Sequence, residues 1–349
     1  MFNRLMLIIC CFAVLGIIFA PGTSYSRPGS AAKWQKLAAG CTPRFAHTGV
    51  WNSKDELMVI FAGEGNIDGK FEFYNDIWTF SPDDQKWEEI KIAGDKPPKR
   101  AYHGSTWDSA ANCMWTFGGC GRNFAPKDDL WKFNFTAKTW EQVTWQGTGP
   151  PARNNPSMHY IESSKQIILY SGFIGFVPNN ALQDLWIFDI AKKTWKSRKC
   201  QAPGRWQCAS AFDQKRGLLM IQGGFDGDSV PKNNTWVYQV KKNKWIDAGV
   251  GPRVTDAHSA VWNSKSGTML IYGGAKSKAK KGFADTWSFN PKNMRWTEFK
   301  TAGQGPGPRA YQSAVWNGPK KCMLIFGGTE NQFNDPPHTT EVYILKTGK

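Results

Sequence analysis

The sequence has little that would build a helical protein or a common catalytic centre. No stretch of about 11 residues or more places apolar residues at helical spacing. There is no Cys-x-x-Cys pair for zinc, no phosphate-binding glycine loop, no metal-ligand cluster and no Ser-His-Asp set that can be recognised. A basic helix or nucleic-acid motif is also missing, although the formal net charge is +16. We therefore expect no nucleic-acid partner, and we interpret the excess of Lys and Arg as a solubilising surface.

Aromatic side chains, in contrast, are abundant. Aromatics make up 14% of the 349 residues, with 18 tryptophans, and hydrophobic residues reach 41%. This composition indicates a globular chain with a large core. Length alone would suggest about two domains, but propellers built only of strands often reach this size as one unit.

The first 26 residues have the layout of a targeting segment. Arg4 gives a positive start, Leu5 to Ala20 is an uncharged apolar run, and Ser24-Tyr25-Ser26 offers a cleavage site. This pattern is typical of a secretory signal peptide. The alternative is an uncleaved N-terminal anchor. We predict a signal peptide at 1–26 and one domain at 27–349, secreted or periplasmic, or else membrane-anchored and extracytoplasmic through that segment alone.

An internal repeat dominates the remainder of the chain. Apolar runs that end in glycine recur every 50 to 56 residues, with their last glycines at Gly63, Gly119, Gly172, Gly224, Gly274 and Gly328. A run such as KRAYHGSTW precedes each of them, and runs such as DDLWKF and AKTWEQV follow. Each repeat therefore holds four short β-type segments separated by turn residues. Four antiparallel strands in about 50 residues predict a propeller blade.

With its glycine doublets and fourth-strand tryptophans, the chain resembles the kelch family over residues 31–349, in six copies. The resemblance implies an all-β, six-bladed propeller in which these tryptophans are core residues. Three positions depart from the pattern: Ala62-Gly63 and Ser171-Gly172 replace Gly-Gly, and Tyr343 replaces a third-strand tryptophan. We expect the fold to accommodate all three.

The first basic-tryptophan segment comes before any repeat has begun. Trp34 lies 53 residues before Trp87, and Trp87 lies 53 before Trp140, so Trp34 is in register with the fourth strands. The sixth copy has no fourth strand of its own. We therefore predict that residues 31–38 supply it and close the ring, which also removes exposed sheet edges.

Functional residues are expected at the mouth of the channel, where the turn before each first strand meets the loop after each second strand. A recurring arginine could bind an anion in bidentate fashion, or could instead pair with Asp76, Asp129, Asp184 or Asp285. The arginines are Arg44, Arg100, Arg153, Arg205, Arg253 and Arg309. The residues beside them vary and suit a sugar or peptide: Phe45, Tyr102, Asn154, Asn155, Trp206, Gln207 and Tyr311.

The loops after each glycine differ in charge. The first copy carries Glu64, Asp68 and Glu72, whereas the fifth carries Lys276, Lys278, Lys280 and Lys281. Such loops are usually only solvated, but they could make the mouth electrostatically uneven. Asp226-Gly227-Asp228 lacks the further oxygen ligands of a calcium loop, so we interpret it as a turn.

A second resemblance bears on catalysis. The segment KRAYHGS looks like the copper-binding segment of galactose oxidase, in which Tyr102 and His103 would be ligands. His47 and His258 occupy the same repeat position, however, so packing is the simpler role for these imidazoles. We expect no cofactor and lean against an enzyme.

We predict an exported, monomeric binding module for a protein or glycan. The alternative is a carbohydrate-active enzyme similar to sialic-acid mutarotase or galactose oxidase, and a third reading is a purely structural envelope protein.

Six cysteines follow residue 26, and an even number in an exported chain permits disulfides. Cys200 and Cys208 flank the turn into the fourth blade, and Cys41 and Cys120 fall on mouth-side loops of neighbouring blades. These are the two predicted pairs. Cys113 and Cys322 begin second strands and are expected to be free and buried.

Overall fold

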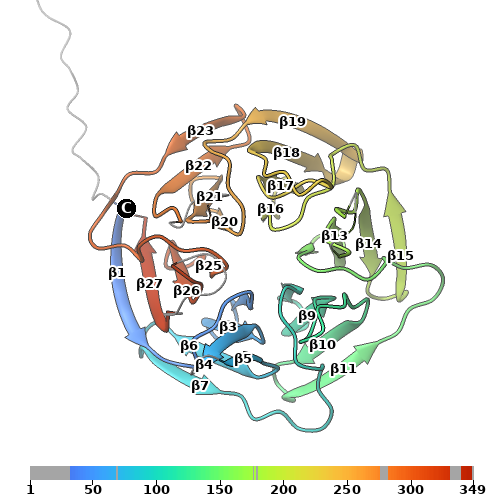
Figure 1. Ribbon diagram of the computed structural model, residues 1–349, viewed down its shortest axis with the longest axis horizontal. Coiled ribbons are helices and arrows are strands. Elements are labelled where there is room, and N and C mark those ends of the chain that lie inside the picture. The colour runs from blue at the N-terminus through green and yellow to red at the C-terminus, as the bar shows by residue number, and fades with distance from the viewer. Residues whose placement is uncertain are drawn as a thin grey trace, which may run out of the picture.

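A computed structural model describes residues 32–67, 70–175, 177, 180–275, 282–330 and 339–347. Within these residues the chain forms six antiparallel sheets arranged as blades around a central axis (Figure 1). The prediction of a six-bladed, all-β propeller is confirmed. The predicted signal peptide at 1–26 lies outside the described residues.

Each blade contains four strands of similar length. The first three blades are β2 (Thr48–Asn52), β3 (Leu57–Phe61), β6 (Ile77–Ser81) and β7 (Lys86–Glu89); β8 (Gly104–Asp108), β9 (Cys113–Phe117), β10 (Leu130–Asn134) and β11 (Thr139–Val143); β12 (Ser157–Ile161), β13 (Gln166–Tyr170), β14 (Leu185–Asp189) and β15 (Thr194–Arg198). The others are β16 (Ala209–Asp213), β17 (Leu218–Gln222), β18 (Asn234–Gln239) and β19 (Lys244–Val250); β20 (Ser259–Asn263), β21 (Thr268–Tyr272), β22 (Thr286–Asn290) and β23 (Arg295–Glu298); β25 (Ser313–Asn317), β26 (Cys322–Phe326), β27 (Glu341–Lys346) and β1 (Ala32–Ala39).

Three short elements add to this frame. A hairpin of β4 (Glu64–Ile67) and β5 (Lys70–Phe73) extends from the first blade, and β24 (Thr301–Ala302) pairs in parallel with β1. A 3₁₀ turn, Val240–Lys242, joins β18 to β19.

The tryptophans of the fourth strands pack between blades, as predicted. Trp140 of β11 contacts Phe133 in its own blade and Phe61 in the preceding blade, with ring centroids 5.1 and 4.8 Å apart. Trp87 repeats this arrangement with Phe80 and with Phe326 of β26. Both sheet faces are therefore covered, which is why β9 and β26 are fully buried and a second strand such as β26 is apolar throughout.

The N-terminal strand closes the ring. β1 pairs antiparallel with β27, with Trp34 opposite Leu345, and completes the sheet of the sixth blade (Figure 1). Trp34 is 3% exposed and packs edge-on against Tyr272 of the fifth blade. The prediction of a fourth strand at residues 31–38 is confirmed, with the observed strand at Ala32–Ala39.

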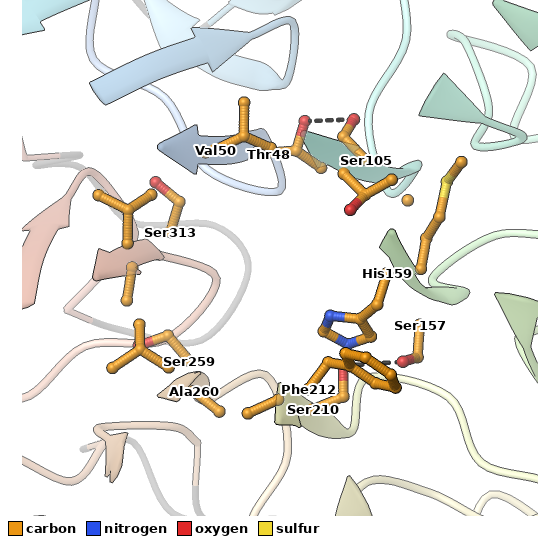
Figure 2. A pocket seen from close by; sticks show the side chains of 18 of the residues that line it. Thr48, Val50, Ser105, Ser157, His159, Ser210, Phe212, Ser259, Ala260 and Ser313 are labelled. Atoms are coloured by element: carbon orange, nitrogen blue, oxygen red, sulfur yellow. Dashed lines mark hydrogen bonds between the residues drawn. The ribbon is translucent and has the colours of Figure 1, made fainter. Parts of the chain in front are cut away.

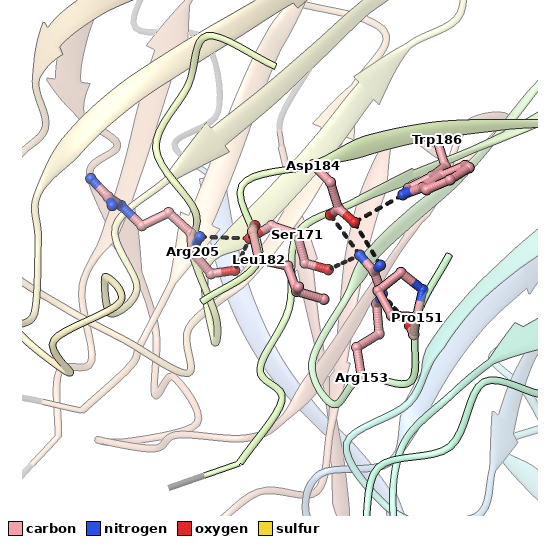
Figure 3. Close-up of polar contacts among 7 residues, drawn as sticks. All are labelled: Pro151, Arg153, Ser171, Leu182, Asp184, Trp186 and Arg205. Atoms are coloured by element: carbon pink, nitrogen blue, oxygen red, sulfur yellow. Dashed lines mark hydrogen bonds and ion pairs between the residues drawn. The ribbon is translucent and has the colours of Figure 1, made fainter. Parts of the chain in front are cut away.

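The glycine doublets mark the points where neighbouring blades touch. Gly119 has φ +81, and its N–H donates to the carbonyl of Arg153 in the next blade. A Cβ on Gly119 would lie 2.5 Å from the carbonyl oxygen of Ala101, so this position requires glycine. In the third blade Ser171 takes the place of the first glycine of the doublet. It adopts φ 55, and its hydroxyl accepts a hydrogen bond from the N–H of Arg205 (Figure 3).

Candidate functional site

The mouth of the propeller is formed by the two sets of loops that the sequence predicts. Short β-bridges join the segment before each first strand to the residue after each second strand, for example Phe45 with Glu64 and Ala101 with Cys120. The residue that follows the first partner of each bridge has a positive φ, and backbone hydrogen bonds link these residues around the mouth. For example, Tyr102 donates its N–H to Ala46, and Tyr311 donates to Ala257.

The recurring arginines are structural clamps. The guanidinium of Arg100 is fully buried and donates to both carboxylate oxygens of Asp129, at 2.8 and 2.6 Å, and to the carbonyl of Gly118 at 2.9 Å. Figure 3 shows the same arrangement at Arg153, whose partners are Asp184 and the carbonyl of Ser171. Each clamp ties the entry turn of a blade to its own second and third strands.

A tryptophan completes the clamp. Trp131 donates its indole N–H to Asp129 at 2.7 Å, and Trp186 does the same to Asp184. Burial alone would raise the pKa of Asp129, but the hydrogen bonds and charge of Arg100 outweigh it and lower that pKa below its ordinary value. The carboxylate therefore stays ionised in the folded protein.

This placement corrects the expectation that the arginines line the mouth. Arg44, Arg100, Arg153 and Arg309 are at most 1% exposed, and the guanidinium of each donates hydrogen bonds within the protein. Arg205 is also buried, with an Asn234 amide in place of the aspartate. The structural alternative that the sequence left open describes the series better than anion binding does.

An apolar cleft opens at the mouth between the loops of the first four blades. Its volume is about 510 Å³. Six of the residues that the sequence pointed to line it: Phe45, Tyr102, Asn154, Asn155, Trp206 and Gln207. Tyr311 lines a narrower neck towards the channel. The other lining residues are Glu64, Phe71, Phe73, Cys120, Arg122, Phe124, Phe173 and Gly175.

Aromatic rings build two walls of this cleft. On one side Trp206 stacks on Phe225, with centroids 4.4 Å apart, and also contacts Phe173. On the other side Phe73 of the β4–β5 hairpin meets Phe124 edge-on at 6.0 Å. Phe124 is 54% exposed although it is large and apolar. The cleft thus presents preformed apolar surface to solvent.

One acidic side chain lies within this apolar wall. Glu64 is 3% exposed, and its Oε1 accepts a hydrogen bond from the hydroxyl of Tyr102 at 2.5 Å. Loss of hydration on burial raises the pKa of Glu64 to about 7, although the hydrogen bond from Tyr102 opposes the rise. Near neutral pH this carboxyl is poised between its two protonation states.

We expect Glu64→Gln to remove a pH-dependent loss of stability. The folded pKa of about 7 lies above the ordinary 4.5, so the folded state binds the proton more tightly. Wild-type stability should therefore fall as the pH rises from 4.5 to 7, by about 3 kcal/mol. Urea unfolding at pH 4.5 and pH 8 measures this. The free energy of unfolding of the variant, relative to that of wild type, should rise by that amount between the two pH values. The exposed hairpin variant Glu72→Gln is the control, and an equal difference between variant and wild type at both pH values would refute the assignment.

The central channel below the mouth is a separate hollow of about 450 Å³ lined by the first strands (Figure 2). Its wall is rich in hydroxyl groups that bond to one another from blade to blade. Thr48 donates to Ser105 at 2.8 Å, and Ser157 donates to Ser210 at 2.8 Å. Figure 2 shows His159 beside Ser210, and its Nε2 lies 2.8 Å from that hydroxyl oxygen.

The recurring histidines are packing residues of the neck and channel, in line with the simpler prediction. Burial lowers the pKa of His47 to about 3 and that of His103 well below its ordinary value, so both are neutral. His103 bonds to Thr48 through Nε2, while its neighbour Tyr102 turns towards Glu64. Among the described residues no group of three or more His, Cys, Asp or Glu side chains is suited to hold a metal ion.

Neither predicted disulfide is formed in the structure, where Cys41, Cys120, Cys200 and Cys208 are free thiols. Cys41 packs near the junction of the first and sixth blades, whereas Cys120 lies in the cleft wall, so that pair is not brought together. Cys200 and Cys208 contact the same core cluster, and their bond stays a prediction. Burial raises the pKa of both to about 12, which disfavours the reactive thiolate after folding. Cys113 and Cys322 are free and buried, as expected.

Sequence reasoning missed the outer wall of the cleft. Phe71 and Phe73 alternate with polar residues in the first copy, and this period of two was a usable signal for the extra hairpin. Phe124 and Phe173 had no comparable signal. Asp226 caps a turn by accepting from the N–H groups of Asp228 and Val230, as predicted. The predicted charges Asp68, Lys276, Lys278, Lys280 and Lys281 lie outside the described residues.

Comparison with known proteins gives a family and several distant relatives. The family model described as "KLHDC2/KLHL20/DRC7 Kelch-repeats domain" matches residues 30–216 and, in a second match, residues 200–349. The flagellar outer-arm dynein alpha chain of Chlamydomonas reinhardtii is 26% identical over 329 residues, which cover 86% of this chain and 7% of the relative.

Two further relatives match shorter stretches. Multiple epidermal growth factor-like domains protein 8 of Mus musculus is 20% identical over 62% of this chain and 8% of its own length. Serine/threonine-protein phosphatase BSL2 of Arabidopsis thaliana is 27% identical over 57% of this chain and 20% of its own length. The chain thus spans a fifth or less of each of these three relatives. No helix in the described ranges is both long and apolar enough to cross a bilayer.

Proposed function

Because this chain belongs to the kelch-repeat family, whose propellers are interaction modules that generally bind proteins, we propose that it binds a protein partner through the mouth cleft. The observation that carries the proposal is the apolar cleft itself, about 510 Å³ in volume and walled by aromatic side chains. Concave apolar sites with a few polar groups are the usual form of a binding site.

The distribution of exposed apolar residues supports this choice. Phe71, Phe124, Ile174 and Val177 are all between 37% and 54% exposed, and they belong to the β4–β5 hairpin or to loops at the mouth. Exposed apolar patches on a soluble domain often mark surfaces that a partner covers. Aromatic side chains are also the most frequent energetic anchors of protein interfaces.

The central channel fits a protein segment less well. Its wall hydroxyls are bonded to one another, as in the Thr48–Ser105 and Ser157–Ser210 pairs, and the neck above it has a volume of only about 130 Å³. A protein segment at the mouth would bury aromatic surface without having to pass Tyr102 and Tyr311.

Peptide selection tests this proposal. A displayed library of random peptides is selected on the wild-type protein, and the enriched peptides are then measured against Trp206→Ala and Phe124→Ser. We expect each variant to weaken binding about tenfold or more, because an interface anchor contributes roughly 2 kcal/mol. Lys320→Ala, outside the mouth, is the matched control. Peptides that bind all variants equally would contradict the proposal, and glycan-array binding that depends on Trp206 would favour a sugar ligand instead.

A further inference from the structure

We propose that the mouth cleft recognises a lysine side chain set between apolar residues of the partner, with the Glu64 carboxylate as the counter-charge. The inference rests on the proposed function and names the chemistry that the same cleft selects. Three features support it: the uncharged residues at the equivalent position of the other blades, the lack of a cation paired with Glu64, and the hydrogen-bond acceptors in the cleft lining.

The fold does not require an acid at this position. Glu64 forms the β-bridge at the rim of the first blade, and the same bridge position in the other blades holds Cys120, Phe173, Phe225, Ala275 and Thr329. None of these is charged. A carboxyl buried in an apolar wall destabilises the fold unless it is paired, so an acid at this one position points to a role beyond forming the blade.

No cation inside the protein pairs with Glu64 among the described residues, whose salt bridges do not include it. Arg122 lines the same cleft, but its side chain is 76% exposed, and its guanidinium donates to the carbonyl of Phe71 and lies 3.6 Å from the carboxylate of Glu72. The hydroxyl of Tyr102 satisfies only Oε1 of Glu64. Ionised Glu64 therefore has no counter-charge among the described residues, and a cationic ligand could supply one.

A polar atom of the cleft lining also favours a donor. The side-chain oxygen of Asn154 is buried in the cleft lining and has no hydrogen-bond partner. A lysine ammonium carries three N–H donors and no acceptor, so it matches a carboxylate beside an amide oxygen. Its four-carbon stem and apolar neighbours would lie along the rings of Phe73 and Trp206.

The pH dependence has a definite sign, because only ionised Glu64 attracts the ammonium. Four groups face Glu64 or share its wall: Tyr102, Tyr311, Cys120 and Arg122. Burial raises the pKa of both tyrosines well above the ordinary value and that of Cys120 to about 12, so none of these three titrates near neutrality. Binding of a lysine peptide should therefore strengthen from pH 6 to pH 8.

Three peptides of one shape and different charge test the inference: Ac-Phe-Lys-Phe-NH₂, its norleucine analogue and its glutamate analogue. Calorimetry at pH 8 should show the lysine peptide binding about tenfold more tightly than the norleucine peptide, a difference near 1.4 kcal/mol. Glu64→Gln should abolish that preference. Glu72→Gln, which removes an exposed acid from the same hairpin, should retain it.

The outcomes separate this inference from the proposed function. A lysine preference that is absent in wild type, or that persists in Glu64→Gln, would overturn the role of Glu64. If the norleucine peptide still bound and lost affinity in Trp206→Ala, peptide binding at the mouth would stand on its own. If none of the three peptides bound at millimolar concentration and library-selected peptides ignored the mouth variants, both proposals would fall.

Discussion

We expect that deletion of residues 31–38 opens the ring. The truncated protein should then lack the cooperative unfolding transition that the wild-type protein shows at its melting temperature. The deletion strips the β1 partner from β27 and exposes the outer edge of the sixth blade at β27. It also removes Trp34, which is 3% exposed and packs on Tyr272. Loss of a buried tryptophan alone costs about 3–5 kcal/mol, and the unpaired edge adds to that loss.

Thermal and urea unfolding would measure the effect, with graded variants of the same strand. We expect Trp34→Ala to lower the free energy of unfolding by about 3–5 kcal/mol and Trp34→Phe by less. Gln35→Ala, at an exposed position of β1, should stay within about 0.5 kcal/mol. A peptide spanning residues 27–41 should partly restore the truncated protein. A truncated protein that melts like the full chain would show that β1 does not hold the ring closed.

Replacing a clamp arginine is expected to have an effect of similar size. Arg100→Ala would leave the Asp129 carboxylate, 16% exposed, without its bidentate partner, and the carbonyl of Gly118 without its donor. Breaking a buried pair by removing one member destabilises proteins by about 3–5 kcal/mol. Arg100→Lys should recover only part of this, because an ammonium cannot bond both oxygens in the same plane.

The fourth blade supplies the matched control for this prediction. Arg205 donates to Asn234, a neutral amide, so Arg205→Ala leaves no buried carboxylate behind and should be milder. The difference should also depend on pH. Because the pKa of Asp129 is lowered in the folded state, the stabilisation by the pair is present above the ordinary 3.8 and is lost as the pH falls through the folded value. Equal effects of Arg100→Ala and Arg205→Ala at pH 7 would contradict the clamp.

The sequence was sufficient for the architecture because a blade is specified by short-range patterns that repeat. The apolar second strands, the glycine doublets and the register of Trp34 each have a local spacing that can be counted. The roles of the arginines could be narrowed but not decided, since Arg100 and Asp129 lie 29 residues apart and meet only in the folded blade. The burial of Arg100 and its bidentate contact with Asp129 then indicate that the pair stabilises the blade.

The cleft was harder to predict, because its walls come from loops that differ between copies. Phe73 and Phe124 belong to neighbouring blades and meet in one wall of the cleft, and no periodic pattern connects them. Glu64 was visible as one charge in an acidic loop, but its burial and its bond to Tyr102 depend on the bridge with Phe45. Loop residues acquire their chemistry from neighbours that the repeat pattern does not encode.

The most direct test of the central claim is a crystal structure of the protein with bound Ac-Phe-Lys-Phe-NH₂. We predict the peptide in the mouth cleft, with an aromatic ring against Trp206 and the lysine nitrogen within hydrogen-bonding distance of Glu64. A peptide bound in the central channel or on the outer strands, with the mouth cleft empty, would contradict the account.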